Sequence, residues 1–213
     1  MDLYFAYLST YSQKTLLGLY ERGVEFTPHL VDLTDPDARA EYHKLYPFGK
    51  VPLLIREDGR MIPESSIILE YIDTSTDGGP FLIPKDPELS RRVRFLDRMC
   101  DLYLNDPVVS LIFESWKPTE QQNLEMMQKA SEKIGIMYRF MEDQLQDREF
   151  LAGDAFSMAD CSALPVLYYA KSFAPFAESP NIQSYWDRQS KRDAFLRVKA
   201  EAEPYITAVM GER

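Results

Sequence analysis

The chain has 213 residues, 45% of them hydrophobic, which is enough for one large domain or two domains of modest size. Its formal net charge of −10 gives a field that repels phosphate backbones and anionic lipid, and no dense run of Lys and Arg occurs, so we expect no nucleic-acid partner. No apolar run approaches the ~18 residues that cross a bilayer, and the first residues lack the basic start and apolar centre of a secretory signal. We therefore expect a cytoplasmic protein without membrane contact.

The first part of the chain alternates strand and helix patterns. Residues 3–7, "LYFAY", alternate as a strand does, and "SQKTLLGLYERG" at 12–23 places apolar residues at helical spacing before a glycine. A second strand is predicted in "VEFTPHLVDL" at 24–33, where Pro28 favours an edge position. A short helix is predicted in "DARAEYHKLY" at 37–46.

The next segment predicts a hairpin and another helix. "VPLLI" at residues 51–55 and "RMI" at 60–62 flank Glu-Asp-Gly, which is typical of a hairpin, and "ESSIILEYI" at 64–72 returns to helical spacing. The predicted order is βαβ followed by ββα. We assign this α/β domain to residues 1–75.

A linker rich in glycine, proline and small polar residues follows. We place it at residues 76–87, within "TSTDGGPFLIPKDP". Almost every later signal is helical, so we expect an all-helical domain over residues 88–213. Its expected helices begin near residue 88, with a bend near Pro107, near residue 119, and after Ser157, Pro180 and Asp193.

The sequence gives little evidence for a metal site or a disulfide bond. Cys100 and Cys161 are far apart and outside any Cys-x-x-Cys spacing, so we expect both to fill core space. His29 and His43 are isolated and lack the spacing of metal ligands or of a catalytic triad. We therefore expect no metal cofactor.

Four motifs, taken in order, carry a family resemblance. They are "STYS" at residues 9–12, "YPFGKVPLL" at 46–54, "PESSIILEYI" at 63–72 and "FLAGDAFSMAD" at 150–160. The second and third closely resemble the patterns NPFGKVPVL and ESxAIxxYL of the cytosolic glutathione transferases, and the four together span most of the chain. This resemblance implies a thioredoxin-like domain followed by an all-helical domain, and glutathione as co-substrate. It also implies a homodimer in which the first domain of one chain meets the helical domain of the other.

Ser9 and Ser12 have the spacing of a Cys-x-x-Cys redox pair in which hydroxyls replace both sulfurs. A glutathione thiol with an ordinary pKa of ~8.5 is only about 3% ionised at pH 7, and the thiolate is the nucleophile. A hydroxyl that donates to the sulfur, together with the positive end of a helix dipole, favours the anion. Lowering the thiol pKa by about two corresponds to ~2.7 kcal/mol. We predict that Ser9 is the donor and hence the catalytic residue.

Other roles for these side chains stay open. Ser12 is better interpreted as the cap of the first helix, and Ser9 taken alone is typical of a turn. Some classes of the family use a tyrosine instead, and Tyr4, Tyr7 and Tyr11 lie nearby, although packing is their simplest interpretation.

Two further motifs are expected to bind glutathione. An extended backbone before a proline can pair with a peptide-like ligand, and the resemblance implies that Val51 does so ahead of a cis Pro52. Lys50 is expected to meet the glycine carboxylate of the ligand, although an exposed lysine is often simply solvated. Free N–H groups at the helix start by Ser65 suit a carboxylate and Glu64 suits an ammonium, so the pair can hold the γ-glutamyl end. Taken alone, this pair is equally typical of an ordinary first helical turn.

The motif "FSMAD" places Ser157 three residues before Asp160, the spacing of a capping box. We interpret it as structural, so Ser157→Ala should lower stability with little direct effect on binding; equal stability of variant and parent would contradict this.

An electrophile pocket is expected between the two domains. Its candidate lining residues, each equally compatible with a core position, are Leu8, Tyr11, Tyr103, Pro107 and Leu111.

Two classes of function are compatible with these features. The first is a glutathione transferase that ionises the thiol of glutathione near Ser9 for attack on a small electrophile. The second is a non-catalytic interaction protein of the same architecture, of the kind of the transcription-associated stringent starvation protein A. The presence together of Ser9, Lys50 and the Glu64–Ser65 pair favours the enzyme. A cysteine-dependent lyase or reductase is disfavoured because Ser9 is not a cysteine.

Overall fold

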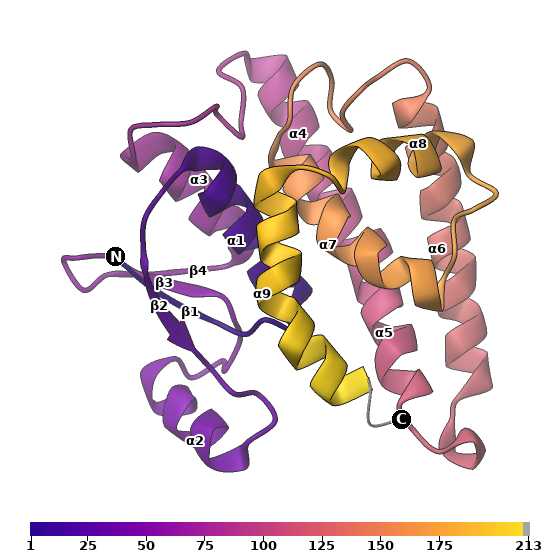
Figure 1. Cartoon of the computed structure of the whole chain (residues 1–213), viewed down its shortest axis with the longest axis horizontal. Helices are drawn as coiled ribbons and strands as arrows, with labels where there is room; N and C mark the ends of the chain where they lie inside the picture. The colour runs from indigo at the N-terminus through magenta and orange to yellow at the C-terminus, as the bar shows by residue number, and fades with distance from the viewer. Residues whose placement is uncertain (211–213) are drawn as a thin grey trace. The chain divides into compact units, whose positions relative to one another are not determined.

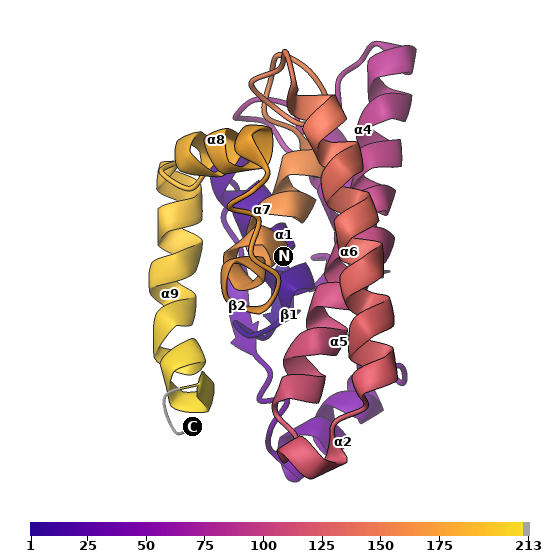
Figure 2. The ribbon, with the colours of Figure 1, turned by 90° about the vertical axis from the view of Figure 1, so that its right-hand side faces the viewer.

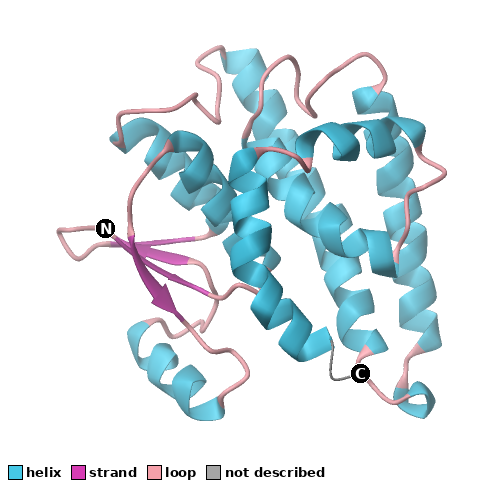
Figure 3. Ribbon diagram, in the orientation of Figure 1, coloured by secondary structure: helices cyan, strands magenta, loops and turns pink. Residues whose placement is uncertain are grey.

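The computed structural model, which describes residues 1–210, joins the expected strands in one four-stranded sheet with the order β2-β1-β3-β4 (Figures 1 and 3). Strands β1 and β2 are parallel, whereas β3 is antiparallel to both β1 and β4. The edge position of β2 agrees with its Pro28, which has no N–H to donate. The strand bounds are Asp2–Phe5 for β1, Thr27–Leu30 for β2, Leu53–Ile55 for β3 and Met61–Pro63 for β4.

Helices cover both faces of this sheet. The order βαβ followed by ββα is confirmed, with α1 at Thr10–Arg22, α2 at Pro36–Leu45 and α3 at Ser65–Ser75. Leu3 and Phe5 of β1 are buried, and α1 packs against α3. A separate small core lies beneath α2, where Tyr42 packs with apolar residues of the sheet and its loops, namely Ala6, Val31, Val51 and Leu53.

The chain divides into two compact units, and the last helix belongs to the first of them. Residues 1–82 and the chain from Asp193 onward form the first unit, and residues 83–192 form the second. Helix α9 (Asp193–Met210) packs against α1, whereas we expected it within the all-helical part. The reason is that aromatic and charged side chains of α1 and α9 contact one another. Residues 211–213 of the expected helical domain lie outside the described residues.

A buried arginine fixes the segment after α3. Arg22 is 2% exposed, lies 3.3 Å from the Asp73 carboxylate, and donates to the carbonyl oxygens of Thr76 (3.0 Å) and Gly79 (2.8 Å). Gly79 has φ of 56°, and a Cβ at this position would lie 2.6 Å from the Arg22 Cα. The expected linker is therefore divided, because its first half is held on α1 within the first unit.

The second unit is helical, as expected. Helices α5 and α6 run alongside one another (Figure 2). Its elements are α4 (Pro87–Met99), the π-helix η1 (Cys100–Asn105), α5 (Asp106–Ser115), the 3₁₀ turn η2 (Thr119–Gln121), α6 (Leu124–Leu145), α7 (Met158–Phe173) and α8 (Pro180–Gln189).

A π-helix, η1, lies where the sequence predicted a bend, and it ends two residues before Pro107. Pro107 lacks an N–H and its ring would crowd the preceding turn of an α-helix, which the wider π-turn accommodates. Helix α6 begins at Leu124 rather than near residue 119, because the Asn123 side chain caps it by accepting from the N–H of Met126.

The expected capping box is present at the start of α7. The N–H and the hydroxyl of Ser157 both donate to the Asp160 carboxylate at 2.9 Å, and the Tyr185 hydroxyl donates to the same group. Burial raises the pKa of Asp160, while these hydrogen bonds oppose that rise. Cys100 and Cys161 are both fully buried, in agreement with the expectation that they fill core space.

Candidate functional site

Ser9 is the residue that caps α1. Its side-chain oxygen accepts from the N–H of Ser12 at 3.2 Å, and its backbone is extended, with φ of −82° and ψ of 117°. The expectation that Ser12 is the cap is therefore wrong: Ser12 lies within the first turn and is completely buried. Because the Ser9 oxygen accepts in this contact, the Ser9 hydroxyl proton is still available for donation. This proton has no acceptor among residues 1–210.

The loop of residues 6–9, which carries Ser9, is fixed by side chains that reach back from α1. The Ser12 hydroxyl oxygen accepts from the N–H of Ala6 at 3.3 Å, and the Gln13 amide donates to the carbonyl oxygen of Tyr7 at 2.6 Å. Ser12 and Gln13 are almost fully buried. Their burial and polar contacts give Ser9 a defined position at the half-exposed start of the helix.

The tyrosines near Ser9 are held in packing contacts. The Tyr4 ring stacks on His29, with centroids 4.5 Å apart, and faces the core beneath α2. The Tyr7 ring stacks on Tyr205 of α9, with centroids 4.9 Å apart. Burial raises the pKa of Tyr7 and the charge of Glu201 raises it further, which makes this hydroxyl a weaker acid than usual.

The segment before β3 contains a cis peptide bond between Val51 and Pro52, as the resemblance implied. Val51 is buried just outside β3, and it lies outside the residues of β3 that pair with β1 and β4, which are Leu53–Ile55. Lys50 is exposed, and its carbonyl oxygen accepts from the buried Tyr42 hydroxyl at 2.9 Å. Tyr42 thus fixes the backbone next to the candidate ligand-binding residues.

His43 has a structural role in the same segment that the sequence did not indicate. Its Nδ1 lies 3.0 Å from the carbonyl oxygen of Pro47, and its ring occupies the space that a Cβ on Gly49 would need. Gly49 has φ of 60°, which favours glycine. A histidine followed six residues later by a glycine in a tight turn is the only sequence signal for this contact.

Glu64 is in a strained conformation at the start of α3. Its φ of 71° is the one positive φ of a non-glycine residue between residues 1 and 210. The Glu64 side chain makes no capping hydrogen bond and is exposed, while Ser65 is buried at the first helical position. Burial raises the pKa of Tyr46, and the charge of Glu64 raises it further.

A buried lysine links the starts of α1 and α3. Lys14 is 1% exposed, and its ammonium donates to the Ser66 hydroxyl at 2.8 Å. Ser66 follows Ser65 directly, so this contact joins the helix capped by Ser9 to the helix that Glu64 precedes. Sequence reasoning did not identify Lys14.

The sheet register brings these segments to one end of the sheet. Tyr4, near the end of β1, pairs with Leu53 at the start of β3, and Leu53 pairs with Pro63 at the end of β4. Ser9 therefore follows β1, Pro52 precedes β3 and Glu64 follows β4 at the same sheet end. The predicted glutathione-binding residues converge, although they are up to 56 positions apart in the sequence.

The predicted electrophile residues belong to different units. Leu8 and Tyr11 are half-buried in the first unit. In the second, Tyr103 is 50% exposed, while Pro107 and Leu111 are buried. Their common role in a pocket stays a prediction.

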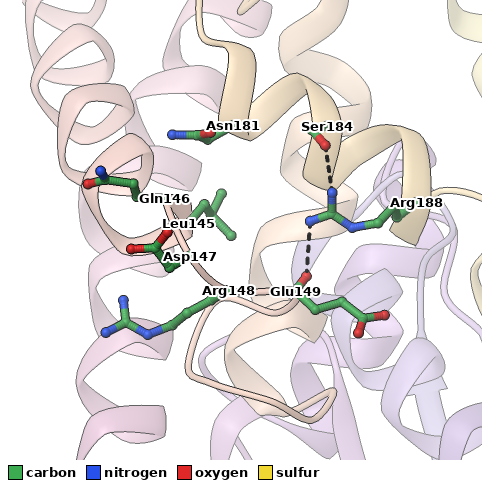
Figure 4. A pocket seen from close by; sticks show the side chains of 8 residues that line it. All are labelled: Leu145, Gln146, Asp147, Arg148, Glu149, Asn181, Ser184 and Arg188. Carbon is green, nitrogen blue, oxygen red and sulfur yellow. Dashed lines mark hydrogen bonds between the residues drawn. The ribbon is translucent and has the colours of Figure 1, made fainter.

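A pocket of about 390 Å³ lies within the second unit, where the end of α6 meets α8 (Figure 4). Apart from Leu145, its lining is polar and charged; Arg188 donates to the Ser184 hydroxyl and to the carbonyl oxygen of Glu149. The N–H groups at the start of α8 are already occupied by the Glu142 carboxylate. None of the predicted site residues lines this pocket.

No group of three or more His, Cys, Asp or Glu side chains within residues 1–210 is arranged to hold a metal ion. No helix in the described part of the chain is long and apolar enough to span a membrane.

Comparison with known proteins agrees with the fold and the motifs. The family model for the glutathione S-transferase N-terminal domain matches residues 8–75, and the model for the C-terminal domain matches residues 104–193. Glutathione S-transferase F10 of Arabidopsis thaliana is 30% identical over 212 residues, which cover 92% of this chain and 95% of the relative.

Solved structures of the family superimpose on most of the chain. A glutathione S-transferase from Methylobacillus flagellatus, solved with glutathione bound, is 27% identical with a TM-score of 0.82 and covers 92% of this chain and 98% of its own. Poplar glutathione transferase F1 is 26% identical, also with a TM-score of 0.82, and covers 95% and 98%. This chain belongs to the glutathione S-transferase family.

Proposed function

We propose that this protein is a glutathione transferase in which the Ser9 hydroxyl stabilises the thiolate of bound glutathione. The observation that carries the proposal is the hydrogen bonding of Ser9. Its oxygen accepts from the Ser12 N–H, so the position of the side chain is fixed while its proton is free to be donated to sulfur. The start of α1 adds the positive end of a helix dipole beside the same atom.

The same sheet end supplies groups that match the rest of glutathione. The backbone of Val51, next to the cis bond to Pro52, is proposed to pair with the cysteinyl backbone of the ligand, and the exposed Lys50 is proposed to bind its glycine carboxylate. The N–H groups at the start of α3, by Ser65, suit the γ-glutamyl carboxylate, and Glu64 suits the ammonium. The strained backbone of Glu64 supports a binding role, because such conformations cluster at ligand sites.

The proposed reaction needs no cofactor besides glutathione as co-substrate. The thiol proton leaves to solvent, the thiolate sulfur forms a bond to an electrophilic carbon, and a leaving group departs or a conjugated bond accepts the electron pair. The pocket for this electrophile is proposed to be lined by Leu8 and Tyr11 from the first unit and by Tyr103, Pro107 and Leu111 from the second.

We further propose that the protein works as a cytoplasmic homodimer, in which the first unit of one chain meets the helical unit of the other. Exposed apolar side chains on both units support this: Phe48 is 75% exposed on the first, and Phe113 (58%) and Ile136 (60%) are exposed on the second. A monomeric mass in solution at micromolar concentration would contradict the dimer.

The test is an ultraviolet difference titration of the glutathione complex, in which thiolate absorbance is followed against pH for the wild type and for Ser9→Ala. We expect a lowered thiol pKa in the wild type that rises in the variant, and a barrier to turnover that is higher in the variant by about 2 kcal/mol or more. An unchanged thiol pKa in Ser9→Ala would move the role to a tyrosine or to backbone N–H groups. Failure of glutathione to bind at millimolar concentration would favour the non-catalytic interaction protein.

A further inference from the structure

The C-terminal helix contacts the loop that carries Ser9. Helix α9 lies against α1 (Figure 1), and its Tyr205 ring stacks on the Tyr7 ring with centroids 4.9 Å apart and planes inclined by 28°. Tyr7 stands two positions before Ser9 in the loop of residues 6–9. The loop is thus held from two directions, at its backbone by the Gln13 amide and at its Tyr7 ring by α9.

The part of α9 that precedes Tyr205 is fixed on α1 by a cluster of polar contacts. The Tyr20 hydroxyl donates to Glu201 Oε2 at 2.6 Å, and Arg197 Nε donates to Glu201 Oε1 at 2.9 Å. The Arg197 guanidinium also lies over the Tyr20 ring, 3.8 Å from its centroid. Tyr205 stands one helical turn after Glu201, so a helix anchored at Glu201 presents Tyr205 at a defined position.

The Tyr7 ring is therefore in stacking contact with α9. Burial raises the pKa of the Tyr7 hydroxyl, and the charge of Glu201 on α9 raises it further. Residues of α1 hold the backbone of the loop and the Ser9 cap. The Tyr7 side chain is held instead by α9, which lies more than 180 residues later in the sequence.

We propose that Tyr205 is a positioning residue for thiol activation: by stacking on Tyr7 it fixes the loop of residues 6–9, and so holds the Ser9 hydroxyl where it donates to the bound thiol. This inference rests on the proposed function. It adds that the end of α9 belongs to the functional site of the first unit, although the helix contributes no group to the ligand.

The first experiment compares full-length Tyr205→Ala and Tyr205→Phe by ultraviolet difference titration of the glutathione complex. Loss of the stack in Tyr205→Ala should raise the thiol pKa and lower the equilibrium constant for thiolate formation by about two- to tenfold, the range that an aromatic pair supplies. Tyr205→Phe keeps the stacked ring and should keep the wild-type thiol pKa. Tyr205 is 39% exposed, so neither variant should prevent folding.

Leu196→Ala is the matched control. Leu196 lies on α9, is 46% exposed, and stands nine residues, or about 2.5 helical turns, before Tyr205. This variant removes a similar apolar surface from the same helix and should leave the thiol pKa unchanged. An equal rise of the thiol pKa in Leu196→Ala would show a general effect of α9 and would overturn the proposal.

A double variant separates this inference from the proposed role of Ser9. In a Ser9→Ala background, Tyr205→Ala should have no further effect on the thiol pKa, because Tyr205 is proposed to act only through Ser9. If Ser9→Ala raises the thiol pKa but Tyr205→Ala does not, the positioning role is refuted and the proposed function stands. If Ser9→Ala itself has no effect, the proposed activation by Ser9 fails, and this inference fails with it.

Discussion

The N–H of Ser12 donates to the Ser9 hydroxyl oxygen across 3.2 Å, so the proposed thiol-activating residue is also the cap of α1. Substitution of Ser9 therefore has two separable consequences. One is a loss of folding stability, because the Ser12 N–H loses its acceptor. The other is a loss of thiol activation, because the hydroxyl proton is removed.

Substitutions of Ser9 that change either the capping oxygen or the hydroxyl proton should separate the effect on folding stability from the effect on thiol activation. Ser9→Ala should lower the free energy of unfolding by about 1 kcal/mol and raise the thiol pKa. Ser9→Asp retains a capping oxygen but brings a like charge to the thiolate, so it should keep most of the stability and raise the thiol pKa further. Ser9→Thr should preserve both. Urea unfolding and thiolate titration of each variant provide the two measurements, and a fully active Ser9→Asp would refute the donor role.

Tyr42→Phe should weaken glutathione binding without affecting thiol ionisation. The variant removes the hydrogen bond from the Tyr42 hydroxyl to the Lys50 carbonyl oxygen, which fixes the backbone beside Val51. We expect the KM for glutathione to rise about two- to tenfold, in line with the net value of one hydrogen bond, while the thiol pKa stays constant. Tyr4→Phe is the control, since Tyr4 borders the same small core and no hydrogen bond of its hydroxyl is found within residues 1–210.

Glu64→Gly should increase stability and decrease affinity for glutathione. A φ of 71° is unfavourable for glutamate and accessible to glycine, so the substitution should raise the free energy of unfolding by about 1 kcal/mol. The proposed contact with the ligand ammonium is lost at the same time. Glu64→Gln serves as the comparison, because it removes the charge but keeps the strain, and should lower affinity without the gain in stability. Calorimetry of unfolding and of binding distinguishes the two; tight binding by Glu64→Gly would argue against the role of this carboxylate.

Glu114 should make the stability of the second unit depend on pH. Its carboxylate is 4% exposed and accepts from Lys117 Nζ at 2.8 Å and from the N–H of Asn123. These hydrogen bonds, that of Lys117 foremost, lower the pKa of Glu114 below its ordinary value of 4.5. A carboxyl group with a lowered folded-state pKa stabilises the fold above its unfolded-state pKa, and this contribution is lost as the pH falls through the folded-state value.

Glu114→Gln should accordingly be less stable than the wild type at pH 7, and the difference should diminish as the pH falls below about 4.5. Urea midpoints for both proteins across this range provide the measurement. Glu120→Gln is the control, because Glu120 is exposed in the neighbouring turn and should show no such trend. If the stability difference between the two proteins is constant with pH, the shape of the Glu114 side chain rather than its charge accounts for its contribution to stability.

The local elements followed from the sequence because their signals are local. Alternation in "LYFAY" and the glycine after "GLYER" correspond to β1 and to the end of α1, where Gly23 has the φ of 64° that a left-handed cap needs. Ser157 and Asp160 form the predicted capping box, since both partners lie within one helical turn. Exact boundaries were less well predicted: α6 begins at Leu124 rather than near residue 119, because Asn123 caps it.

The sequence by itself determined the order of elements and the family motifs, because both depend on spacing along the chain. The family resemblance carried by those motifs then identified Ser9, Val51, Pro52 and Glu64 as candidates. Only the tertiary structure decided which hydroxyl caps α1, that Tyr42 supports the Lys50 backbone, and that α9 returns to stack Tyr205 on Tyr7. The cap of α1 is a choice between two hydroxyls three residues apart, whereas the other two contacts join residues that no local period connects. Their energies arise when packing brings distant side chains together, so they leave no periodic trace in a single sequence.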